Sequence, residues 1–186
     1  MINPERLESF FRQELYQIIQ KRKDYLNVET DIVTQDIDYL TGVLLRFVDT
    51  AQFKANFTST PLFELALKQR SVSKAELQGL ADFCLWRVGF FPFGFNQRHT
   101  PPRKNFVVVG KSAYLRLSDI SHPALIFLSL GKNFLLFANL ISELRLQNIT
   151  DIDIMELWEF WEETENQFAA EQLRKMNVVP RHLKKM

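Results

Sequence analysis

Apolar residues recur every three or four positions along nearly the whole chain, the spacing that places them on one face of an α-helix. A first helix is predicted to begin at Pro4, since proline lacks an N–H that the first helical position does not need, and to end near the basic run 21–23. A second helix is predicted to follow Thr34, and a short third helix to begin at Thr60-Pro61. The apolar stripe of the first helix consists of Leu7, Phe10, Phe11, Leu15, Ile18 and Ile19.

The fourth predicted helix has the clearest start. Ser73 and Glu76 have the spacing of a capping box, in which each side chain accepts a hydrogen bond from the backbone of the other residue. Gly89 and Pro92 are expected to end this helix, because glycine tolerates a positive φ and proline prevents the helix from resuming. The predicted buried face contains Leu77, Leu80, Ala81, Cys84, Leu85 and Val88.

The segment 105–118 can be read in two ways. The run 107–109 consists of three valines and is typical of a strand, but apolar and small residues of the segment share one helical face, which favours a helix. A long apolar helix is then predicted from Ser121 to about Leu146, and a last helix from Thr150 or Asp151 onward. The apolar face of this last helix contains Ile154, Leu157, Trp158, Trp161, Phe168 and Leu173.

Together these segments predict an all-α fold, a single domain over residues 1–186 with about six or seven helices around one core and a short basic tail at 178–186. Six glycines and seven prolines are too few for a chain rich in tight β-turns. Seventeen phenylalanines predict a core built from aromatic rings, including most of the run 90–95.

Two features bear on the compartment. The most apolar stretch, Ala124 to Ile141, contains Lys132 near its centre, which favours a buried helix over a membrane span. The single cysteine, Cys84, excludes an intrachain disulfide, and the N-terminal residues do not form the apolar run of a signal peptide. We therefore expect a protein of the cytoplasm.

Most catalytic and cofactor motifs are missing from the sequence. The glycines are too dispersed for a phosphate-binding loop, and no pair of the three histidines has the spacing of two metal ligands on one helix. Glu-x-x-His, the motif of carboxylate-bridged metal centres, does not occur. Cys84 lies on an apolar stripe, where a free cysteine acts as a small core residue rather than a nucleophile. We therefore predict no catalytic residue, no metal and no cofactor.

Charges are segregated along the chain. Residues 83–118 include no acid, whereas residues 151–171 include eight acids and neither lysine nor arginine. Two interpretations remain open. The acidic helix can pack across the basic connector, or the connector can face solvent and bind an anion, an acidic partner protein or, least favoured, a nucleic acid. The candidate binding residues within this connector, residues 87–116, are Arg87, Arg98, Arg103, Lys104, Lys111 and Tyr114.

One resemblance supports the helical prediction. The stretch 80–92, with Gly89-Phe90-Phe91-Pro92 at a helix end, and the later Gly110-Lys111-Ser112-Ala113-Tyr114 resemble a family of uncharacterised bacterial all-helical proteins. Lys111 replaces the arginine of that pattern, and the acid that often follows Phe-Pro is absent. The resemblance implies a helical fold and a bacterial source, and no activity. By themselves, Gly110 and Ala113 predict close helix packing, and Tyr114 predicts a buried ring whose hydroxyl has a partner.

The function expected from these observations is non-enzymatic, either protein–protein interaction or a structural role. The first alternative is a small-molecule binder or enzyme with a pocket in the Phe-rich core, where Arg87 or Tyr114 orients the ligand. The second alternative is binding of an anion or a nucleic acid through the basic connector. The sequence does not predict an oligomeric state.

Overall fold

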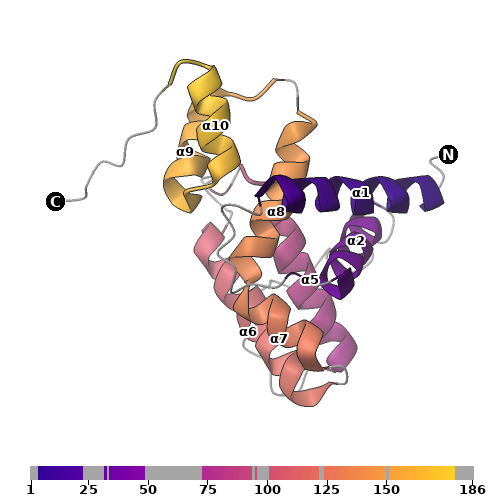
Figure 1. The fold of residues 1–186 in the computed structure, drawn as a ribbon. Coiled ribbons are helices and arrows are strands. Elements are labelled where there is room, and N and C mark those ends of the chain that lie inside the picture. The colour runs from indigo at the N-terminus through magenta and orange to yellow at the C-terminus, as the bar shows by residue number, and fades with distance from the viewer. Residues whose placement is uncertain are drawn as a thin grey trace.

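The structure is a computed structural model that describes residues 4–22, 32, 34–48, 73–93, 95, 101–121, 124–149 and 151–178. These residues form eight helices and no strand (Figure 1). The predicted all-α class is therefore confirmed, with eight helices where six or seven were expected. The short helix predicted at Thr60-Pro61 lies outside the described residues.

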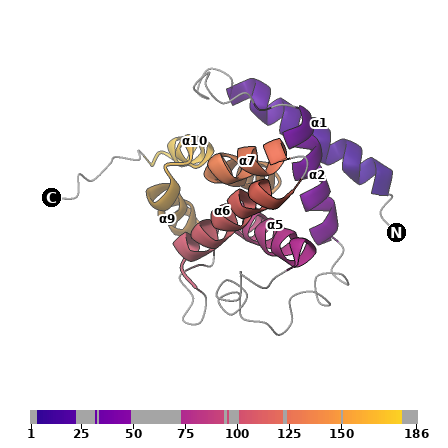
Figure 2. The ribbon, with the colours of Figure 1, turned by 90° about the horizontal axis from the view of Figure 1, so that it is seen from below.

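Four helices, α5 to α8, form the centre of the molecule. Helix α5 packs against both α6 and α8, and α6 packs against α7. Helices α1 and α2 pack against each other on one side of this centre, while α9 and α10 pair on the other side (Figure 2). The bounds are α1 Pro4–Arg22, α2 Thr34–Val48, α5 Lys74–Phe90, α6 Arg103–Ile120, α7 Ala124–Lys132, α8 Phe134–Gln147, α9 Ile154–Thr164 and α10 Gln167–Lys175.

Helix α5 begins with the predicted capping box. The Glu76 N–H donates to Ser73 Oγ at 3.3 Å, and the Ser73 N–H donates to Glu76 Oε2 at 2.9 Å. The helix ends at Phe90, but the predicted reason for this end was wrong. Gly89 is still helical and does not have a positive φ. Gly89 is instead needed for packing, since an added Cβ would lie 2.7 Å from the Cβ of Ile141 in α8.

Replacing Ser73 by alanine is expected to lower the melting temperature by about 2–4 °C, the usual effect of losing an N-cap. The hydrogen bonds from Ser73 lower the pKa of Glu76. A lowered pKa in the folded state means a stabilisation that is present above the ordinary value of 4.5 and is lost as the pH falls through the folded value. The difference between wild type and variant in thermal melts should therefore shrink below pH 4.5. A pH-independent difference would contradict the capping-box account.

The ambiguous segment 105–118 lies within helix α6, so the prediction of a helix is confirmed. The predicted close approach at Gly110 is present, because a Cβ there would lie 2.5 Å from the Phe134 ring and 2.7 Å from the Cβ of Cys84. Tyr114 is fully buried, and its hydroxyl has a partner, as the sequence predicted.

The single apolar helix predicted from Ser121 to about Leu146 is wrong. The segment consists of α7 and α8, which are bent by 77° around Asn133, and Ser121 lies at the C-terminal end of α6 instead. The bend allows α7 to pack on α6, where Gly131 approaches Leu115 so closely that a Cβ would lie 2.7 Å from its side chain. Among the described residues no single helix is long and apolar enough to cross a membrane; only α7 and α8 taken together would be, and they are bent.

The predicted last helix is also two helices. The backbone of Glu165 has φ 51° and ψ 28°, a left-handed conformation that ends α9, and Asn166 then caps α10 by accepting a hydrogen bond from the Ala169 N–H at 3.0 Å. The residue that caps α9 is Asp153, not Thr150 or Asp151; its carboxylate accepts from the Met155 N–H at 2.7 Å.

Within the part of the chain that the structure describes, buried apolar residues form two clusters rather than the one expected core. The larger cluster spans α1, α2 and α5 to α8, and the smaller one joins α9 and α10 to Leu146. The phenylalanine-rich interior is confirmed, and of the run 90–95 only Phe91 is exposed among the rings. Arg22 links the two parts, because it contacts Glu143 in α8 at 3.0 Å and Glu171 in α10 at 3.1 Å.

Candidate functional site

The six predicted site residues do not form one surface. Arg98 lies outside the described residues. Tyr114 is in the core, away from the solvent. The half-buried Arg87 donates to the Phe91 carbonyl at 3.1 Å and lies over the Phe95 ring at 4.1 Å. Lys104 and Lys111 are exposed, and Arg103 is buried.

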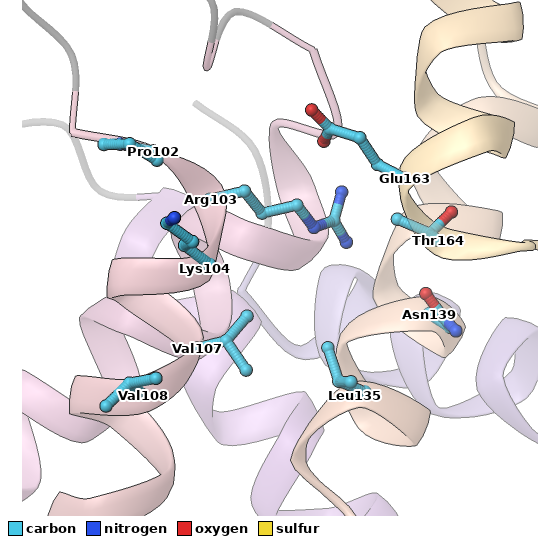
Figure 3. A pocket seen from close by; sticks show the side chains of 9 residues that line it. All are labelled: Pro102, Arg103, Lys104, Val107, Val108, Leu135, Asn139, Glu163 and Thr164. Carbon is cyan, nitrogen blue, oxygen red and sulfur yellow. The ribbon is translucent and has the colours of Figure 1, made fainter. Parts of the chain in front are cut away.

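Arg103 and Lys104 line a cleft of about 610 Å³ between the start of α6, the exposed side of α8 and the end of α9 (Figure 3). This volume lies within the range of small-molecule sites. The cleft is lined by Pro102, Arg103, Lys104, Val107, Val108, Leu135, Asn139, Glu163 and Thr164.

Arg103 is the unusual group of this cleft. Arg103 is only 7% exposed, yet neither its Nη1 nor its Nη2 atom has a hydrogen-bond partner. The guanidinium lies over the ring of Phe160 at 5.0 Å and farther from that of Phe95, at 5.9 Å. Burial lowers the pKa of Arg103 to about 10, so the group stays charged at neutral pH. A buried cation that lacks hydrogen-bond acceptors is costly, and this makes Arg103 the candidate binding group of the cleft.

The local sequence explains how Arg103 reaches this position. Pro102 occupies the N-cap of α6 and provides no side-chain acceptor, so the first backbone N–H groups of the helix are not capped by a side chain. Arg103 and Lys104 follow directly, so two cationic side chains lie at the positive end of the helix dipole. The whole end of α6 is therefore an electropositive wall of the cleft.

The opposite wall comes from α8 and α9. In Figure 3 the Arg103 side chain extends across the cleft toward Thr164, with the Glu163 carboxylate beside its guanidinium. The charge of Glu163 partly offsets the lowering of the Arg103 pKa, but no ion pair within 4 Å joins these two side chains. Helix α9 is thus a neighbour of the basic connector at this point, and it leaves the guanidinium unpaired.

Two further properties of the cleft concern its other side chains. The Oδ1 atom of Asn139 is buried without a hydrogen-bond partner, so a residue of the same cleft has an unpaired acceptor. Val107, Val108 and Leu135 form an apolar part of the lining, and Val108 and Leu135 are 63% and 52% exposed. The cleft therefore combines a cationic end, a polar amide and an apolar floor.

A second polar cluster lies inside the main core and was not predicted. Asp82 accepts hydrogen bonds from the hydroxyls of Tyr39 and Tyr114, each at 2.7 Å, and its other oxygen lies 2.9 Å from Arg46. Burial raises the pKa of Asp82, while Arg46 and the two hydroxyls oppose this rise. Gln78 donates to the Tyr39 hydroxyl at 3.1 Å. Since these groups bind one another, we assign the cluster to the structure of the core.

The described residues offer neither a metal site nor a reactive thiol. No group of three or more histidine, cysteine or carboxylate side chains there is arranged to hold a metal ion. Cys84 is buried between helices, and burial raises the pKa of its thiol, which removes the thiolate needed for nucleophilic chemistry.

The fold and the cleft together define the chain as an all-helical protein with a cationic, partly apolar cleft. Comparisons of the chain with protein-family models, with curated proteins and with solved structures give no match. The resemblance to a bacterial helical family therefore stays an expectation, and the account of function depends on the residues of the cleft.

Sequence reasoning identified Arg103 and Lys104, and one of its two interpretations placed the acidic helix that contains Glu163 next to them. It missed Asn139 and Leu135 as their neighbours. Asn139 gave a signal, since it is a polar residue within the most apolar stretch of the chain. The neighbours of Asn139 in the cleft were not predictable, because the bend between α7 and α8 determines which helix faces the start of α6.

Proposed function

We propose that this protein is a non-enzymatic binding protein whose cleft between α6, α8 and α9 receives the anionic group of a ligand. The observation that carries the proposal is the buried guanidinium of Arg103, whose two Nη atoms lack hydrogen-bond acceptors. Arg103 is also one of the residues that line a cleft large enough for a small molecule. An anion in the cleft would provide those acceptors and would also meet the positive end of α6.

This proposal develops the second alternative drawn from the sequence, anion binding by the basic connector, and narrows it to one end of α6. A nucleic acid is disfavoured, because such a partner needs a continuous basic surface. Of the candidate cations, Arg87 already binds a backbone carbonyl and Arg103 is buried in the cleft. A pocket formed around Tyr114 is also disfavoured, because that hydroxyl is bound to Asp82.

The proposal can be tested by thermal melts with octanoate, octyl phosphate and neutral octanol as probes. At saturation we expect at least one of the two anions to raise the melting temperature by about 5 °C or more, because a ligand at 100 times its Kd stabilises the native state by about 2.7 kcal/mol. Octanol should have little effect.

Two variants localise the effect. Arg103→Met should remove the rise, whereas Lys111→Met, which removes an exposed cation of the same helix outside the cleft, should retain it. The proposal fails if neither anion raises the melting temperature, or if the rise persists in Arg103→Met.

A further inference from the structure

The geometry points to a class of ligand: an apolar monocarboxylate with a hydrogen-bond donor close to the carboxylate, such as a 3-hydroxy acid or an N-acyl amino acid. This inference rests on the proposed function and adds the chemistry of the anion, of its body and of one neighbouring group. Each of the three properties follows from a different part of the cleft.

The form of the cation favours a carboxylate. Both Nη atoms of Arg103 are without partners, and a guanidinium presents its N–H donors in a planar fork that matches the two oxygens of a carboxylate. The rings of Phe160 and Phe95 lie near the guanidinium and restrict its position, so the fork is held in place before a ligand arrives.

The charge of the cleft favours a single negative charge. Arg103 and Lys104 carry two positive charges, and Glu163 carries one negative charge on the opposite wall. A monoanion bound at Arg103 leaves the cleft close to neutral. A phosphate dianion adds repulsion from Glu163 within the same cleft.

The floor of the cleft favours an apolar body. Val107, Val108 and Leu135 lie beside Arg103 and Lys104 in the cleft (Figure 3). Val108 and Leu135 are both more than half exposed. A ligand that covers the apolar surface of a cleft removes it from water, which makes the free energy of binding more favourable. A short acid such as acetate would leave this surface uncovered.

Asn139 provides the third property. Its Oδ1 atom is buried and has no partner, and Asn139 lines the same cleft as Arg103. A buried acceptor of this kind requires a donor, and a carboxylate provides none. A hydroxyl or amide N–H next to the carboxylate of the ligand would fill this requirement.

Isothermal titration of the full chain with four probes tests the inference. Octanoate should bind on the order of 100-fold more tightly than acetate, because its chain covers the apolar floor, and about tenfold more tightly than octyl phosphate. A 3-hydroxyoctanoate should bind about fivefold more tightly than octanoate, and this gain should vanish in Asn139→Leu. Arg103→Lys, which keeps the charge and loses the fork, should weaken octanoate about tenfold, whereas Lys111→Met should leave its binding unchanged.

The outcomes separate the inference from the proposed function. If octyl phosphate binds at least as tightly as octanoate and depends on Arg103, the cleft is an anion site and the carboxylate inference is overturned. Equal affinities for acetate and octanoate overturn the apolar body, and a hydroxyl gain that persists in Asn139→Leu overturns the donor. If no probe binds, both the inference and the proposed function fail.

Discussion

Replacing Asp82 by alanine is expected to lower the free energy of unfolding by about 3–5 kcal/mol, the usual cost of breaking a buried charged network. The alanine would leave the hydroxyls of Tyr39 and Tyr114 without their acceptor and Arg46 without its counter-ion. Urea denaturation followed by circular dichroism measures the effect. The buried position of Asp82 at the meeting point of α2, α5 and α6 is the reason for this large loss.

Two variants control for this result. Asp119→Ala removes an exposed acid of α6 and should change the free energy of unfolding by less than about 0.5 kcal/mol. Asp82→Asn keeps an acceptor oxygen and should lose less than the alanine variant. A loss below about 1 kcal/mol in Asp82→Ala would show that the two hydroxyls do not depend on this carboxylate.

The second large effect is expected at Glu143, where an alanine should lower the free energy of unfolding by about 3 kcal/mol. The Glu143 carboxylate accepts from Arg22 Nε at 3.0 Å and from Nη2 at 3.3 Å, and its removal leaves a buried guanidinium with one half-exposed partner, Glu171. Burial raises the pKa of Glu143, and the guanidinium of Arg22 opposes that rise.

Glu171→Ala is the matched control, because this residue binds the same guanidinium from a side chain that is 45% exposed. Its loss should cost no more than about 1 kcal/mol. Replacing both buried partners, Arg22→Met with Glu143→Leu, should recover much of the stability lost in Glu143→Ala. If Glu143→Ala and Glu171→Ala lowered the free energy of unfolding equally, burial would not be the reason for the large effect expected at Glu143.

Local features of the fold were predictable from the sequence where one helix determines them. The capping box of Ser73 and Glu76 depends only on residues three apart, and the helical face of 105–118 depends only on its own spacing. The two breaks, at Asn133 and at Glu165, were missed because apolar periodicity continues across them. The break at Asn133 has a tertiary cause, since Gly131 allows α7 to approach Leu115 of α6, which an apolar pattern does not reveal. The break at Glu165 is local, since its left-handed backbone ends α9 and the Asn166 side chain caps α10.

The candidate site was also predictable only where it depends on neighbouring residues of the sequence, and not where it depends on helix packing. The charge pattern led to Arg103 and Lys104, which lie next to each other in the sequence. It did not separate a buried arginine from an exposed one, because burial of Arg103 depends on the position of α9. It also grouped Tyr114 with these cations, whereas the structure pairs that residue with Asp82, an acid at a position that the sequence shows only as part of an apolar helix.

The central claim is that Arg103 is kept for a ligand and not for the fold, and the stability of Arg103→Met without any ligand tests it most directly. Methionine keeps an apolar stem and removes a buried charge without hydrogen-bond acceptors. In urea denaturation at pH 7 we expect a free energy of unfolding equal to that of wild type or up to about 2 kcal/mol higher. A loss of about 3 kcal/mol or more would mean that the guanidinium is bound within the protein, and it would contradict the claim.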